Sequence, residues 1–239
     1  MIKLEGRNPV EEALKENIVT LIRVESTRNR DPRLQAILNN AVKKKVRIEE
    51  IPRHKLDNLS DTGHHQGIIA LAQPDAQWGI NKVLEETGKD ICLLMLDQVQ
   101  DPHNLGAILR TSEATGVDGV IIPKKGSASL SPTVHRVSMG GSLRVPVWER
   151  NFYPVLKKLK DDGLFVIGID SSGPKTIYEE NLDVPAVFII GGEDRGISPT
   201  LLDRCDSILR IPMRGQLESL NVGVATAVVL YERLRQQEK

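Results

Sequence analysis

Along the first 73 residues, the spacing of the apolar residues changes repeatedly between the spacing of a strand and that of a helix. Alternating or β-branched runs predict strands, whereas apolar residues three or four positions apart predict helices. Asp31 is a favourable N-cap and Pro32 a favourable first helical residue. The expected helices are 8–16 and 31–45, and the expected strands are 18–26, 46–52 and 67–72. The pattern indicates a compact α/β unit.

From residue 91 onward the apolar runs lose their alternation. Such runs are typical of a parallel sheet covered by helices on both faces. Helical patterns lie between them, so the predicted fold class is α/β. The expected strands are 91–97, 119–123, 144–149, 164–170, 186–192 and 207–212, and the expected helices are 104–116, 131–140, 152–162, 198–205 and 221–235. Three parts are predicted: a domain at 1–73, a linker with a short helix at 74–90, and a domain at 91–239.

Charge and composition narrow the class of protein without fixing it. The chain of 239 residues is 40% hydrophobic, and its 32 Lys and Arg balance 32 Asp and Glu. The chain as a whole therefore lacks the excess positive charge typical of many nucleic-acid-binding proteins, although a chain with no net charge can still have local basic patches. The first 73 residues hold 13 Lys and Arg against 10 Asp and Glu, and three of the five His. This mild basic bias favours a nucleic-acid contact in the N-terminal part.

The cysteine pattern and the chain start bear on the compartment. Cys92 and Cys205 are far apart, which indicates a reducing environment rather than a disulfide scaffold. The start, MIKLEGRNPVEEAL, is charged from its third residue, unlike a secretory signal. No apolar run approaches the ~18 residues that span a bilayer. We expect a cytoplasmic protein without a membrane partner.

Ligands in open α/β sheets bind beyond the carboxyl ends of the strands, here after positions 97, 123, 191 and 212. The first of these segments reads DPHNLGAILR. On a helix that starts near 104, Asn104, Ala107 and Arg110 share one face. Ordinary helix capping explains Asp101 and Pro102 but not Arg110, because an arginine on a buried helix needs an anionic partner.

The second segment, IIGGEDRGISP, places Gly191, Gly192, Glu193 and Gly196 at a strand end. Glycines there permit close backbone approach to a ligand. The spacing matches neither a phosphate-binding P-loop nor the G-x-G-x-x-G of dinucleotide enzymes. Glycines with one acid and no lysine suit a ligand bound through backbone groups, and ordinary turn and helix-start chemistry is an equally good explanation of the segment.

The third segment, IPMRGQLESLNVGVATAVVL, leads into the last helix. Taken alone, Ser219 or Asn221 is favoured as a helix N-cap over a binding residue. The three segments together occupy one edge of the predicted sheet, which favours a site.

These residues also carry a family resemblance. DPHNLGAILRTSEATGVDGVIIP, FIIGGEDRGISPTLLDRCD and IPMRGQLESLNVGVATAVVLYE resemble, in order and spacing, the three motifs of the SpoU (TrmH/RlmB-type) branch of the SPOUT RNA methyltransferases. GRNPVEEAL and HHQGIIA resemble the ribosomal-protein-like RNA-binding domain of 23S rRNA guanosine 2′-O-methyltransferases.

The resemblance implies methyl transfer from S-adenosylmethionine to a ribose 2′-hydroxyl of RNA, with no metal required. It also implies a C-terminal trefoil knot and a homodimer. A guanosine of 23S rRNA is the expected target, because tRNA-acting relatives commonly lack the N-terminal domain. The alternatives are a tRNA 2′-O-methyltransferase and an inactive RNA-binding relative.

Site residues follow from the same resemblance, position by position. The implied catalytic residues are Asn104, Arg110, Glu193, Ser219 and Asn221. The implied cofactor-binding residues are Gly191, Gly192, Ile211, Met213 and Leu220. Arg110 is either a base primed by an RNA phosphate or an electrostatic clamp. The third motif usually reads Ser-Leu-Asn-Val-Ser, and here Gly223 stands in the last position, which predicts a missing hydroxyl.

Overall fold

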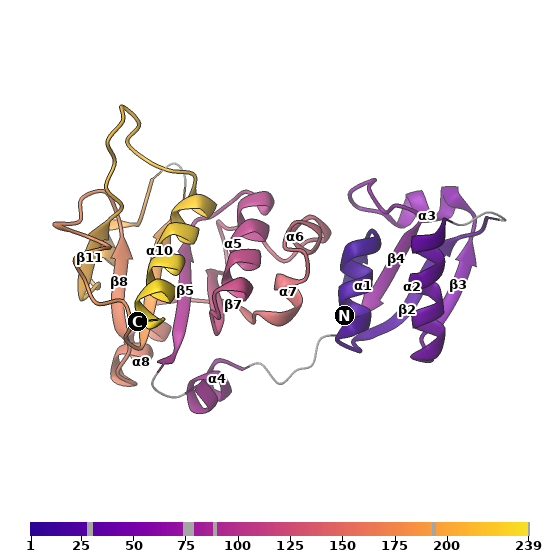
Figure 1. Cartoon of the computed structure of the whole chain (residues 1–239), viewed down its shortest axis with the longest axis horizontal. Helices are drawn as coiled ribbons and strands as arrows, with labels where there is room; N and C mark the ends of the chain where they lie inside the picture. Colours follow the sequence, from indigo (N-terminus) through magenta and orange to yellow (C-terminus); the bar gives the residue numbers. More distant parts are fainter. Residues whose placement is uncertain (28–30, 74–78, 88–89, 193–194, 239) are drawn as a thin grey trace.

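Two β-sheets organise the chain, one near each end (Figure 1). We call the part that contains residues 1–73 the smaller body and the part from residue 90 onward the larger body. The computed structural model describes residues 1–27, 31–73, 79–87, 90–192 and 195–238. Among these residues, no helix is long and apolar enough to span a bilayer.

The smaller body has a four-stranded mixed sheet in the order β1-β4-β2-β3, with β2 and β3 parallel and β4 antiparallel to both β1 and β2. Its elements are β1 (Ile2–Glu5), α1 (Arg7–Lys15), β2 (Val19–Glu25), α2 (Pro32–Lys43), β3 (Arg47–Ile51), α3 (Arg53–Leu59) and β4 (Ile68–Ala72). All five predicted elements are present. The pattern missed β1, and it missed α3 because that helix buries only Leu56 and shows no apolar periodicity.

The larger body has seven strands in the order β7-β6-β5-β10-β8-β11-β9, and every pairing is parallel, which confirms the predicted sheet. Helix α4 (Ile80–Thr87) lies between the two bodies in the sequence. The elements of the larger body are β5 (Cys92–Asp97), α5 (Pro102–Ala114), β6 (Gly119–Pro123), α6 (Pro132–Val137), α7 (Gly141–Arg144), β7 (Val147–Arg150), α8 (Phe152–Asp161), β8 (Phe165–Ile169), β9 (Lys175–Thr176), β10 (Ala186–Gly191), α9 (Pro199–Leu202), β11 (Ser207–Arg210) and α10 (Val222–Gln237).

Both faces of the larger sheet are covered, as its unbroken apolar strands predict. All six residues of β5 are buried, and they alternate between two apolar clusters. Leu94 and Leu96 pack with buried residues of α5 and α10, whereas Leu93 and Met95 pack with buried residues of α8. Helices α5 and α10 therefore lie side by side on one face, and both begin at the carboxyl edge of the strands, the upper edge in Figure 1.

The structure corrects two predicted helices. The stretch 131–140 is not one helix, because Met139 and Gly140 adopt left-handed backbone conformations (φ 51° and 101°) between α6 and α7. The predicted helix 198–205 is the single turn of α9, which starts at Pro199 after Ser198. The first change lies beside α5, and the second follows the glycine-containing segment after β10.

Candidate functional site

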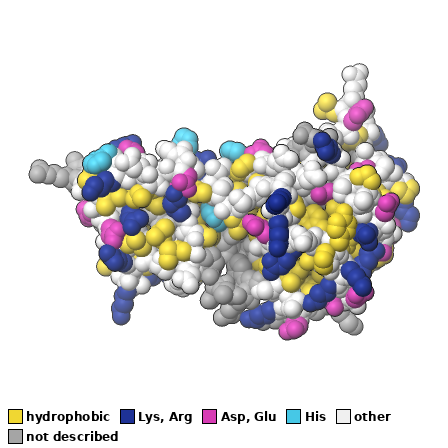
Figure 2. All heavy atoms as spheres, turned by 180° about the vertical axis from the view of Figure 1, so that it is seen from behind, with side chains coloured by type: hydrophobic (Ala, Val, Ile, Leu, Met, Phe, Trp, Pro, Cys, Tyr) yellow, Lys and Arg dark blue, Asp and Glu magenta, His cyan; other side chains and the backbone are white. Residues whose placement is uncertain are grey.

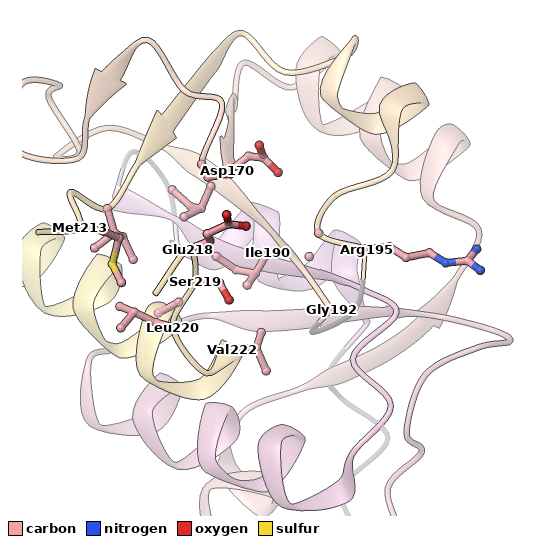
Figure 3. A pocket seen from close by; sticks show the side chains of 15 residues that line it. Asp170, Ile190, Gly192, Arg195, Met213, Glu218, Ser219, Leu220 and Val222 are labelled. Carbon is pink, nitrogen blue, oxygen red and sulfur yellow. The ribbon is translucent and has the colours of Figure 1, made fainter. Parts of the chain in front are cut away.

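A cavity of about 460 Å³ opens at the carboxyl ends of β8, β10 and β11 (Figure 3). Its size falls in the range of small-molecule sites. It is lined by Ile169, Asp170, Ser171, Ile190, Gly191, Gly192, Arg195, Gly196, Ile211, Met213, Glu218, Ser219, Leu220, Val222 and Ala225. All five residues predicted to bind the cofactor are in this wall, so the second and third motifs meet in one hollow.

The loop after β10 is held tightly against the end of β5. The backbone N–H of Gly192 donates to the carbonyl oxygen of Asp97 (2.7 Å), and that of Ser198 donates to the Asp97 carboxylate (2.9 Å). A Cβ at Gly191 would overlap the backbone of Gly196. Glycine is therefore required by close packing of the protein's own backbone, whereas the sequence pattern was interpreted as close approach to a ligand. Glu193, the predicted acid of this motif, lies outside the described residues.

Asn221 is both the N-cap of α10 and a link between two motifs. Its side-chain oxygen accepts from the N–H groups of Gly223 (3.0 Å) and Val224 (3.3 Å). Its side-chain nitrogen donates to the side-chain oxygen of Asn104 on α5 (3.0 Å). Ser219 does not cap the helix and instead lies exposed in the cavity wall. The first and third motifs are thus joined directly.

Arg110 occupies an unexpected environment. Its helix begins at Pro102 rather than near 104, with Asp101 as N-cap, so Asn104 lies in the first turn. Arg110 is exposed and forms no ion pair with any residue that the structure describes. The sequence placed Arg110 on a buried helix with an anionic partner, but its side chain is exposed and no such partner is found among the described residues. The guanidinium stands outside the cavity wall, where an external anion can reach it.

Gly223 fits against α5. It is the second residue of α10 and not a mid-helix position, so the full mid-helix cost of glycine does not apply. A Cβ there would lie 3.5 Å from the Cβ of Ala107 and 3.2 Å from the side-chain oxygen of Asn221. The position is buried and tight, which leaves little room for a larger side chain.

Three charged residues of the cavity were missed from the sequence: Asp170, Arg195 and Glu218. Asp170 follows β8 and accepts from both the N–H and the hydroxyl of Ser172 (2.9 and 2.7 Å). Figure 3 shows the Glu218 side chain toward the middle of the hollow and that of Arg195 pointing away. The strand-end rule would have found Asp170 at the end of the apolar run 164–170, whereas the segments directly after 97 and 123 do not line the cavity.

The two cysteines offer no nucleophile. Burial raises the pKa of the Cys92 thiol to about 12 and that of the Cys205 thiol to about 11. Thiols with such pKa values stay protonated at neutral pH and are unreactive. The described ranges also contain no group of His, Cys, Asp and Glu suited to hold a metal ion.

Comparisons with known proteins give matches in both bodies. Residues 92–231 match the model of the SpoU rRNA methylase family, and residues 3–78 match that of the RNA 2′-O ribose methyltransferase substrate-binding domain. The chain is 39% identical over 212 residues to the 23S rRNA (guanosine-2′-O-)-methyltransferase RlmB of Pseudomonas putida, covering 87% of this chain and 85% of that protein.

Two further similarities extend over nearly the whole chain. An uncharacterized tRNA/rRNA methyltransferase of Mycolicibacterium vanbaalenii is 38% identical over 237 residues, covering 97% of this chain and 76% of that protein. The crystal structure of the SpoU methyltransferase AviRb from Streptomyces viridochromogenes, in complex with AdoMet, superposes with a TM-score of 0.86 at 22% identity, covering 99% and 90% of the two chains. By its sequence and its fold, the chain belongs to the SpoU rRNA methylase family.

Proposed function

We propose that this protein transfers a methyl group from S-adenosylmethionine to a ribose 2′-hydroxyl in RNA, with a guanosine of 23S rRNA as its target. The observation that carries the proposal is the Asn221–Asn104 hydrogen bond, which ties the cavity wall to the helix of Arg110. The similarity to RlmB of Pseudomonas putida supports the rRNA target. Because ribosomal RNA is the proposed substrate, we place its action in the cytoplasm.

The cavity suits S-adenosylmethionine. Apolar side chains of Ile190, Ile211 and Leu220 offer a surface for the adenine ring, and the glycine loop offers backbone groups. The carboxylates of Asp170 and Glu218 complement the positive charges of the cofactor. When bound, the cofactor supplies a methyl group already activated on a sulfonium. The trefoil knot implied by the resemblance remains part of the proposal, supported by the packing of α10 beside α5 after the loop that follows β11.

The residues of the chain then have to align and polarise the 2′-hydroxyl. Alignment of reacting atoms alone supplies much of a rate enhancement. We propose that Asn104, Ser219 and Asn221 position the ribose and that Glu193 contributes to the same site. Arg110 clamps an RNA phosphate and stabilises the developing alkoxide, since a guanidinium stays protonated in proteins and is a poor base.

We propose that residues 1–73 bind the RNA, that 74–90 form a linker and that 91–239 form the catalytic domain. In the smaller body, Arg7, Arg33 and Arg53 line an open hollow of about 570 Å³. Figure 2 shows Lys and Arg side chains on the reverse face of the smaller body, mixed with acidic ones. Such a surface predicts moderate, salt-sensitive RNA binding.

We also propose that the protein acts as a homodimer, as the resemblance implies. Val224 and Tyr231, seven positions apart on α10, are 51% and 53% exposed. Two apolar side chains two turns apart on one helix face favour a contact with another chain. Sedimentation of the full chain tests this part.

The central test is an Arg110→Ala variant. We expect turnover on 23S rRNA to fall by at least about a hundredfold, the effect of removing one transition-state donor. S-adenosylmethionine binding, measured by calorimetric titration, should stay within about twofold because Arg110 is outside the cavity wall. Arg110→Lys should be impaired as well, since it keeps the charge and loses the planar fork. Turnover within a few-fold of wild type would remove Arg110 from the mechanism.

A further inference from the structure

A short segment of the larger body, residues 139–144, contacts both the smaller body and α5. We call it the docking segment. It contains the two left-handed residues between α6 and α7, followed by α7 itself. Leu143 is 4% exposed and belongs to the apolar cluster of the smaller body, with Val10 and Leu14 of α1. A side chain of one body thus completes the core of the other.

Arg144 is the polar part of the same contact. Its guanidinium lies 2.6 Å from the carboxylate of Glu12 and 2.9 Å from that of Glu16, both at the α1 side, and 3.7 Å from that of Glu113 on α5. The arginine side chain is 32% exposed and that of Glu12 is 19% exposed. One cation therefore joins α1 of the smaller body to α5 of the larger one.

Two glycines allow the segment to approach both neighbours. Gly140 has φ 101°, and a Cβ there would lie 3.0 Å from the Cγ of Glu12. A Cβ at Gly141 would lie 2.5 Å from the carbonyl oxygen of Leu109 and 3.1 Å from the Cα of Arg110. The docking segment thus rests on the backbone of the residue proposed to hold the RNA phosphate.

We propose that the docking segment fixes the RNA-binding body on α5, and that Arg144 is a positioning residue that aligns bound RNA with Arg110. This inference rests on the proposed function. In agreement with this, the start of α2 and the starts of α5 and α10 lie along the same upper edge in Figure 1. RNA bound to the smaller body is then held in a fixed orientation toward the carboxyl edge of the larger sheet, where α5 and α10 begin.

The test compares Arg144→Glu, Glu12→Arg and the double variant that exchanges the two charges. Arg144→Glu replaces three attractions by repulsion from three carboxylates. Because the repulsion undocks the RNA-binding body, RNA contacts both bodies at once less often, and we expect the KM for a 23S rRNA transcript to rise about tenfold. The kcat and the calorimetric affinity for S-adenosylmethionine should stay within about twofold, because RNA that does engage both bodies meets an unchanged site. Lys157→Glu, an equal charge change on the exposed face of α8, is the control and should leave the KM unchanged.

The double variant should recover at least about threefold of the lost KM, because the exchanged pair restores one attraction. Small-angle X-ray scattering supplies a readout independent of activity: Arg144→Glu should increase the radius of gyration, and the double variant should reverse the increase. An unchanged KM and radius in Arg144→Glu, or a double variant no better than the single one, would overturn the proposal. A fall in kcat with an unchanged KM and a smaller fraction of cofactor-binding protein would assign Arg144 a merely structural role. If the wild type methylates no RNA while the radius still responds, the docking contact stands and the proposed function fails.

Discussion

Replacing Asn221 separates its role as a helix cap from its role as a link to α5. Asn221→Ala removes both the two cap bonds and the bond to Asn104. Asn221→Asp keeps an oxygen that accepts from the N–H groups of Gly223 and Val224. It loses the donor to Asn104 and places a negative charge opposite the oxygen of that side chain. Asn221→Ala therefore removes the cap and the link to α5, whereas Asn221→Asp removes only the donor to α5.

The expected sizes follow from these bonds. Loss of a side-chain cap costs about 1 kcal/mol, and loss of a hydrogen bond between neutral groups costs about 1 kcal/mol. Asn221→Ala should thus destabilise the protein by about 2 kcal/mol. For a chain of this length, that energy lowers the Tm by about 4 to 8 °C. Asn221→Asp should lose about half as much, because the cap is retained and an anion at a helix N-terminus is favourable.

The assay pairs thermal unfolding with methyl transfer to 23S rRNA, each measured on both variants. Both variants should lose most of their turnover, because each removes the donor to Asn104. An Asn104→Ala variant serves as the partner in a double-mutant cycle and should be non-additive with Asn221→Ala. If Asn221→Asp is as unstable as Asn221→Ala, the cap assignment is wrong. If Asn104→Ala is fully active, the link to α5 has no part in catalysis.

Two further predictions concern buried positions near this region. Gly223→Ser should change the free energy of unfolding by no more than about 0.5 kcal/mol and leave turnover within about threefold. Gly223→Leu should destabilise the protein by at least about 2 kcal/mol, because the larger side chain would clash with Ala107. Equal effects of the two substitutions in a urea titration would contradict the tight packing. Burial lowers the pKa of His135 to about 4. Below pH 6.5 the unfolded chain binds this proton first, so stability should fall by about 2 kcal/mol from pH 7 to pH 5, and a His135→Gln variant should lack that part of the fall. The same pH slope in wild type and variant would refute the assignment.

The arrangement of the larger body was predictable because its strands carry a strong signal. The apolar runs 119–123 and 91–97 correspond to β6 and β5 almost residue for residue, since burial on both faces leaves few polar positions. The break in the helix at Gly140 was not predictable, because glycine is required there by the close approach of Glu12 from the other body.

The candidate site was predictable in its composition but not in its geometry. The motif pattern identified Asn104 and Asn221, yet it could not show that their side chains share a hydrogen bond across 117 positions. The strand-end rule could have indicated Asp170 as a candidate, but not that it shares a cavity with the second and third motifs, which depends on the position of β8 next to β10 in the sheet. The exposure of Arg110 likewise depends on which face of α5 packs inward, a property of the assembled layers.

The cavity has a consequence for the order in which this protein is made. Its wall combines residues 169–171, 190–192 and 195–196 with residues between 211 and 225, so the last part of the wall is synthesised shortly before the chain is finished. Domains emerge and fold in sequence during translation, with the N-terminal one first. A growing or truncated chain that ends before residue 211 would therefore carry the proposed RNA-binding body without a complete proposed cofactor site, so the proposed activity requires the chain through the start of α10.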